Sequence, residues 1–99
     1  MKISFSDIGH SLTTRSLAKT IRPIIVENLK QSADKIELDF NGVKVITNCF
    51  ADECFAKLLI DFDLEFIKSK TSFRNVNPFI QSTIKIAFSN RLSQSALSK

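Results

Sequence analysis

Apolar and polar residues recur along the chain at two different periods, and these periods predict where strands and helices lie. Residues 2–6 and 35–40 alternate at every second position, which is typical of strands with one buried face. From Thr14 to Leu29 the apolar residues follow helical spacing, with Pro23 inside the pattern. Because proline removes a helix hydrogen bond, we expect it to kink or restart this helix.

A turn and a second helix follow the second strand. Asn41-Gly42 is a strong turn signal, and the short apolar stretch 43–46 comes directly after it. Apolar residues then repeat at helical spacing over residues 50–62. This pattern predicts a second helix.

The first residues of this helix suit its amino end. Thr47 or Asn48 can cap the free backbone N–H groups. We expect Asp52 and Glu53 in the first turn, where the positive end of the helix dipole favours negative charge.

The remaining chain adds one more strand and one more helix. Residues 71–76 form a strand candidate, and Asn77-Pro78 then supplies a cap and a first helical residue for a helix with an apolar stripe to Leu92. Residues 64–68 fit a strand or a helical turn equally well. The order β-α-β-α-β-α predicts an α/β fold, a small sheet with three helices packed on it.

The composition limits the chain to one core. Ninety-nine residues, 43% hydrophobic and 24% charged, exclude a multidomain enzyme, a fibrous repeat and a disulfide scaffold. Residues 1–93 are expected to form the domain, with a polar tail at 94–99. The nine Phe, without Tyr or Trp, are expected mainly to fill the core.

The net charge and the lengths of the apolar runs indicate where in the cell the protein acts and whether it binds membranes. The net charge of +4 comes from scattered residues with no basic block, which indicates a solvated basic surface. We expect neither a signal peptide nor a membrane span, because the apolar runs are only a few residues long. A cytoplasmic protein that does not bind membranes is therefore expected.

Residues that carry metal or acid–base chemistry do not form a recognisable set. Cys49 and Cys54 lack the CxxC spacing, and His10, the single histidine, is expected to be an exposed loop residue. Asp39 is expected to cap a turn, because no second carboxylate is spaced to pair with it. We therefore expect no cofactor, no metal and no enzymatic activity. The acidic residues Asp61, Asp63 and Glu65 are interpreted as a solvated helix end.

Residues 38–49 are similar to the central motif of STAS domains, the fold of the bacterial anti-sigma-factor antagonists. The segments 50–53 and 75–77 resemble more specifically the bacterial STAS-like domain of unknown function. The resemblance covers residues 1–93, and its most specific part is 39–53.

This resemblance implies a non-enzymatic regulatory module that binds another protein. In the antagonists, a kinase partner with a GHKL-type ATPase fold phosphorylates a serine at the start of the second helix, and the unmodified form binds that partner. By position the phosphoacceptor falls on Cys49, and a thiol cannot take part in that serine cycle. Docking on a GHKL-type ATPase or another regulatory protein is implied for Asn41, Gly42, Thr47, Asn48, Cys49 and Asp52.

Three alternatives remain at this point. A nucleic-acid-associated module of a transcriptional or phage-defence locus would stack bases on an exposed Phe73 or Phe5. An enzyme would use Cys49 as its nucleophile. A homodimer would pair the edge strand near Ile3 with a second copy.

Overall fold

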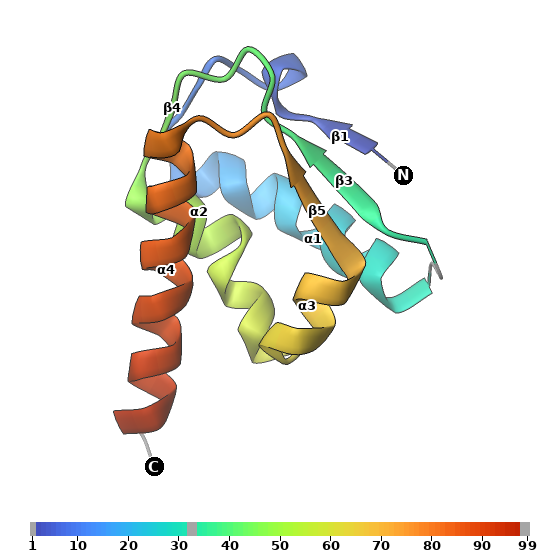
Figure 1. Cartoon of the computed structure of the whole chain (residues 1–99), viewed down its shortest axis with the longest axis vertical. Helices are drawn as coiled ribbons and strands as arrows, with labels where there is room; N and C mark the ends of the chain where they lie inside the picture. The colour runs from blue at the N-terminus through green and yellow to red at the C-terminus, as the bar shows by residue number, and fades with distance from the viewer. Residues whose placement is uncertain (1, 32–33, 98–99) are drawn as a thin grey trace.

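The computed structural model describes residues 2–31 and 34–97. It is a mixed α/β domain in which two small parallel sheets are connected by helices (Figure 1). In chain order the elements are β1 (Lys2–Ser4), the 3-10 turn η1 (Phe5–Asp7), β2 (Ser11–Leu12), α1 (Arg15–Gln31), β3 (Ile36–Asp39), β4 (Val45–Ile46), α2 (Asn48–Cys54), the 3-10 helix η2 (Ala56–Ile60), α3 (Leu64–Lys70), β5 (Thr71–Arg74) and α4 (Pro78–Leu97).

The larger sheet has the strand order β1-β3-β5, and both strand pairs are parallel. Its central strand β3 aligns Glu37 with Lys2 on one side and with Ser72 on the other. The smaller sheet pairs β2 with β4, again in parallel. Parallel neighbours need crossover connections, which here contain the helices.

Only one face of the larger sheet is packed against the core. Ile36 and Leu38 of β3 are buried, whereas Glu37 and Asp39 lie on the other face. On that outer face Lys2 Nζ lies 3.3 Å from Asp39 Oδ2 across the strands. This one-sided burial accounts for the strict alternation in the sequence of β3.

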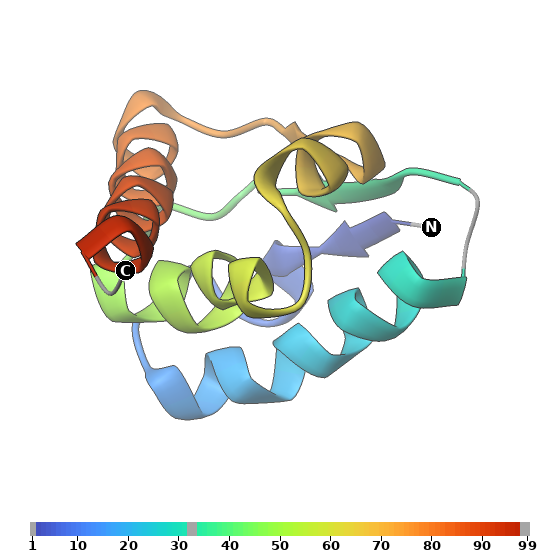
Figure 2. The same ribbon diagram turned by 90° about the horizontal axis from the view of Figure 1, so that it is seen from below.

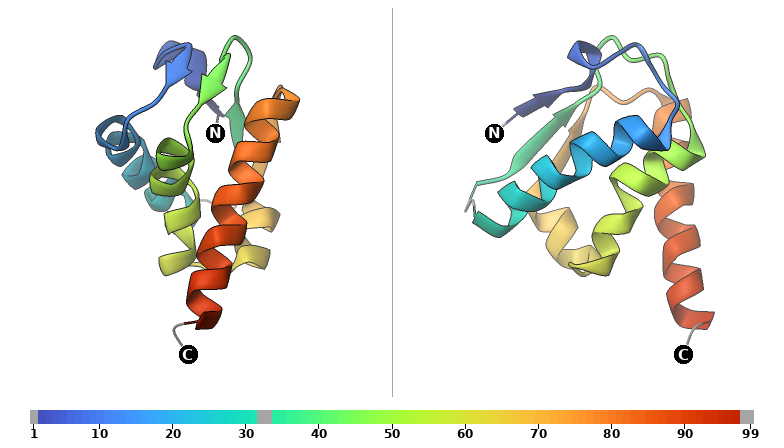
Figure 3. Two further views of the ribbon diagram at one scale, coloured as in Figure 1. Left: turned by 90° about the vertical axis from the view of Figure 1, so that its left-hand side faces the viewer. Right: turned by 180° about the vertical axis from the view of Figure 1, so that it is seen from behind.

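The helices are arranged around α2. The helix α1 runs along α2, and α4 packs against α2 from another side (Figure 2). Figure 3 shows α1 and α4 well separated, with α2 between them. The helix α3 lies directly before β5 and contacts it. The position of α2 therefore decides how α1 and α4 are placed.

Five phenylalanine rings form the centre of the core. Phe5 stacks on Phe40 with the ring centroids 4.5 Å apart. Phe55 makes edge contacts with both, with Phe50 and with Phe73, at centroid distances of 5.4–6.3 Å. Such edge-to-face pairs are favourable for aromatic rings. The prediction that the phenylalanines mainly fill the core is correct for this group.

The expectation of three helices is wrong, because the described residues contain four α-helices. The additional helix is α3, which includes the segment 64–68 that fitted either a strand or a helical turn. Asp63 Oδ1 accepts a hydrogen bond of 2.8 Å from Phe66 N and caps the helix, while Ile67 is buried beneath it. A cap and a buried residue one turn later favour the helical alternative.

Several predicted elements are shorter than expected, among them the strand predicted over 71–76, which ends at Arg74. The helix predicted over 50–62 ends as an α-helix at Cys54 and continues as the 3-10 helix η2. The strand predicted over 2–6 ends at Ser4. Directly after it, Ile8 N and Gly9 N both donate hydrogen bonds to the Phe5 carbonyl and close a tight turn.

The last helix begins as predicted. Asn77 Oδ1 accepts a 2.8 Å hydrogen bond from Ile80 N, and the proline between them occupies the first helical position. The helix continues to Leu97, within the segment 94–99 that was predicted as a polar tail. The end of that segment, 98–99, lies outside the described residues.

Pro23 does not interrupt α1, which is one helix from Arg15 to Gln31. Thr14 Oγ accepts a 3.2 Å hydrogen bond from Leu17 N at its start, as a capping side chain does. Pro23 is exposed, and so is Lys19, whose backbone carbonyl loses its helix hydrogen bond because proline has no N–H.

The turn after β3 depends on a glycine. Gly42 has φ +89°, and a Cβ there would lie 3.3 Å from Ser6 Cβ. We expect Gly42→Ala to lower the free energy of unfolding by about 1–2 kcal/mol, because an L-residue at this φ is strained. Urea unfolding monitored by circular dichroism measures the loss. The matched variant is Gly9→Ala, whose Cβ would make only an ordinary contact of 3.5 Å; equal losses for both variants would contradict the expectation.

Candidate functional site

Two loops at the end of the β-strands are joined into one surface, which we call the loop edge and define as residues 9–13 and 41–49. The short β2–β4 ladder aligns the two segments, and Lys44 N donates to the His10 carbonyl at 2.9 Å. Thr47 N donates to the Leu12 carbonyl at 3.1 Å. Backbone hydrogen bonds therefore hold the loop edge in one shape.

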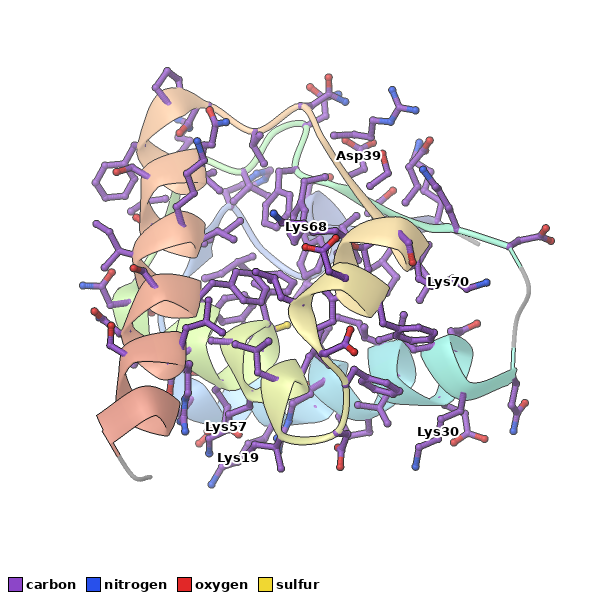
Figure 4. All side chains as sticks on the ribbon, turned by 60° about the horizontal axis from the view of Figure 1, so that its bottom comes forward. Lys19, Lys30, Asp39, Lys57, Lys68 and Lys70 are labelled. Carbon is purple, nitrogen blue, oxygen red and sulfur yellow. The ribbon has the colours of Figure 1, made fainter. Side chains whose placement is uncertain are left out.

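The Asn41-Gly42 turn is held by Asp39, at the end of the central strand (Figure 4). Asp39 Oδ1 accepts hydrogen bonds from Asn75 Nδ2 at 2.8 Å and from Asn41 N at 3.0 Å. These bonds, together with Lys2, lower the pKa of the Asp39 carboxyl. The predicted turn-capping role of Asp39 is thus confirmed.

His10 lies over the same turn. Its Nδ1 donates a 2.9 Å hydrogen bond to the Gly42 carbonyl, and its side chain is exposed. The expectation of an exposed loop residue is correct, and the histidine also links the two halves of the loop edge.

Thr47 caps α2, as one of the two predicted alternatives. Its Oγ accepts from Phe50 N at 3.3 Å and donates to the Thr13 carbonyl at 3.0 Å. Cys49 Sγ lies 3.2 Å from Thr47 Oγ and 3.4 Å from the Thr13 carbonyl oxygen. The half-buried thiol of Cys49 is therefore part of the contact between α2 and the loop before α1.

Asn48 is the first residue of α2 and, unlike its two neighbours, is exposed. It lies on the same loop edge as the exposed turn Asn41-Gly42. The exposed residues of the loop edge are His10, Ser11, Thr13, Asn41, Gly42, Lys44 and Asn48.

Asp52, the last of the residues implied as a partner contact, is engaged inside the molecule. Arg91 of α4 forms a bidentate pair with it, Nε to Oδ1 at 2.7 Å and an Nη to Oδ2 at 2.8 Å. Arg15 of α1 adds a contact of 3.1 Å to Oδ2. The expectation that Asp52 and Glu53 lie in the first turn of their helix is wrong, because α2 begins at Asn48 and both follow one turn later.

Glu53 is buried, with a side chain that is 1% exposed, and this burial was not predicted from the sequence. Lys57 Nζ lies 2.7 Å from its Oε1, with Arg15 at 3.2 Å from the same oxygen and Arg22 at 3.2 Å from Oε2. A buried carboxylate is retained only where cations compensate its lost hydration. We call Asp52, Glu53, Arg15, Arg22, Lys57 and Arg91 the ion-pair cluster.

The ion-pair cluster favours the ionised acids. Hydrogen bonds from Arg91 lower the pKa of Asp52, with a further contribution from Arg15. Burial alone would raise the pKa of Glu53, but Lys57, Arg15 and Arg22 together hold it below its ordinary value. The cluster therefore joins α1, α2, η2 and α4 by charge.

Acid is expected to weaken the fold through these groups. A carboxyl with a lowered pKa in the folded state contributes stability that is present above its unfolded pKa, about 4, and is lost as the pH falls through the folded value. We expect Asp52→Asn to lose about 1 kcal/mol at neutral pH and to flatten the fall in unfolding free energy below about pH 4. Urea unfolding at a series of pH values measures both. Asp61→Asn, at an exposed residue outside the cluster, is the control, and an equally flattened curve for it would contradict the assignment.

The remaining acidic and thiol side chains considered in the sequence analysis belong neither to the loop edge nor to the ion-pair cluster. Asp63 is a helix cap, and burial raises the pKa of the Cys54 thiol, which lies in the core. Within residues 2–31 and 34–97 no three His, Cys, Asp or Glu side chains are placed to hold a metal ion. None of the described helices is both long and apolar enough to span a membrane.

One of the comparisons with known proteins identifies a family for this chain. A family model described as a STAS-like domain of unknown function matches residues 18–81. The match extends from α1 to the start of α4 and includes the turn and the whole of α2. No significant match was found among curated proteins or among solved structures.

Proposed function

The chain belongs to the family of STAS-like domains of unknown function, and from this premise we propose that it is a non-enzymatic regulatory module that binds a partner protein through the loop edge. The observation that carries the proposal is that Asn41, Gly42 and Asn48 are all exposed on the loop edge, a surface that internal hydrogen bonds already hold in shape. A surface that needs little ordering loses less free energy on binding.

The partner that we propose is a GHKL-type ATPase, as the resemblance to anti-sigma-factor antagonists implies. Cys49 occupies the position of their phosphoacceptor serine and lies half-buried against Thr13. The proposed complex therefore forms without a serine phosphorylation switch at this position, and the exposed amides of Asn41 and Asn48 supply its polar contacts.

Nucleic-acid binding, the alternative function, is less well supported than protein binding. Phe5 is fully buried, which corrects the expectation that it could stack a base, and Phe73 belongs to the phenylalanine cluster. Among the basic side chains, Arg15, Arg22, Lys57 and Arg91 are engaged by the buried or half-buried acids of the ion-pair cluster. A protein surface is thus favoured over a nucleic acid.

We expect Asn48→Arg to weaken binding to a purified GHKL-type ATPase of the same organism about tenfold or more, because it would put a long charged side chain into the proposed contact. Isothermal titration calorimetry measures the affinity. Asn48 is preferred to Asp52 as the site of the change, because substitution of Asp52 would also break the ion-pair cluster.

Asn90→Arg provides the matched control, since Asn90 is exposed on α4, several turns from the loop edge. The control variant should bind like the unchanged protein. Equal affinity of Asn48→Arg and the unchanged protein for the ATPase would exclude the loop edge as the docking surface.

A further inference from the structure

A groove of about 510 Å³ lies between α4 on one side and α3 with β5 on the other. The two walls can be followed in Figure 2, where α3 and α4 stand apart. The apolar side chains that line it are Leu64, Ile67, Phe73, Val76, Ile84, Phe88 and Leu92. It is a different surface from the loop edge, with which it shares no residue.

Both walls of this groove carry an exposed lysine. Lys68 lies on the α3 wall and Lys85 on the α4 wall (Figure 4 labels Lys68). Neither lysine forms an ion pair within the described residues. The lining residues include no Asp or Glu, and α4 contains neither. An apolar floor therefore lies between two positive rims.

We propose that this groove binds an acidic amphipathic helix of a partner protein. A helix that inserts an apolar stripe presents its flanking side chains to both rims, and acidic residues there would meet Lys68 and Lys85. The lining residues of α4 extend from Gln81 to Leu92, which at 1.5 Å per residue is about 16 Å, or three helical turns. The length and the paired charges both suit a helix.

The probe is a designed acidic peptide of about 20 residues, long enough to form a helix, with leucines on one stripe and glutamates on both flanks. We expect Lys68→Glu with Lys85→Glu to weaken its binding about tenfold or more at low ionic strength. The matched double variant Lys19→Glu with Lys30→Glu changes exposed lysines of α1 and has the same net charge. It should change the affinity less than about twofold.

A second variant tests the apolar floor without a change of charge. Leu92 is 41% exposed, so Leu92→Ser leaves the core intact, and we expect it to weaken the peptide about threefold. Asn48→Arg should leave peptide binding unchanged, so a failure here is distinguishable from a failure of the loop-edge proposal.

Several outcomes would overturn the groove proposal. One is equal binding of the peptide to both double lysine variants. A second is equal binding of a control peptide with lysine in place of glutamate. A third is binding of phosphatidylglycerol vesicles, but not of the peptide, that depends on Lys68 and Lys85. A fourth is a dimer seen by light scattering that Leu92→Ser abolishes.

Discussion

Replacement of Phe55 by alanine is expected to lower the free energy of unfolding by about 4 kcal/mol. Phe55 is fully buried and makes ring contacts with Phe5, Phe40, Phe50 and Phe73. Its removal takes away transfer free energy, leaves a cavity between four rings and breaks every edge contact. A domain of this size has about 5–15 kcal/mol in total, so the loss would be a large share of its stability.

Urea unfolding measures this loss, and two further variants make it interpretable. Phe55→Leu keeps most of the volume and should cost about 1.5 kcal/mol, so it reports on the site even if the alanine variant does not fold. Phe79→Ala removes a ring that is 57% exposed, and should cost less than about 0.5 kcal/mol. A loss at residue 55 no larger than the loss at residue 79 would show that the ring cluster is not the centre of the core.

Glu53→Ala is expected to cost about 3 kcal/mol. The carboxylate is buried among Arg15, Arg22 and Lys57, and its removal leaves three cations without their common partner. Each of these cations is partly exposed and can turn towards water, which places the expected cost at the lower end for a broken buried pair. The packing of α1 and η2 on α2 should loosen with it.

The charge of Glu53 can be separated from its volume. Glu53→Gln keeps the shape and some hydrogen bonds but no charge, so we expect a smaller loss, about 2 kcal/mol. Glu65→Ala, at an exposed glutamate of α3, serves as the control and should cost less than about 0.5 kcal/mol. If Glu53→Ala were as mild as this control, the three ion pairs of Glu53 would contribute nothing to the stability of the fold.

Local patterns predicted the elements whose stabilising contacts are also local. The alternation of residues 35–40 indicated β3, since a half-buried strand needs exactly that period. The caps at Thr47 and Asn77 were readable because a capping side chain bonds to a backbone N–H three residues later. The segment that became α3 was ambiguous, because seven residues are too few to separate the two periods.

In the candidate site, too, the local features were predicted from the sequence and the long-range contacts were not. The Asn41-Gly42 turn, the α2 cap and the place of Cys49 followed from neighbouring residues and from the family motif. The hydrogen bonds that join this segment to His10 and Thr13 connect residues more than 30 positions apart, and no spacing predicts them.

The sequence by itself therefore determined the α/β class, the family and the 41–49 segment of the loop edge, because periodicity and caps act within a few residues. Only the tertiary structure decided which charged side chains are buried and which ion pairs they form. Asp52, predicted as a partner contact, is held by Arg91, 39 residues away, and Glu53 is buried beside Arg22. Coulomb attraction depends on distance in space and not along the chain, so only the packing of α1 and α4 on α2 could bring these groups together.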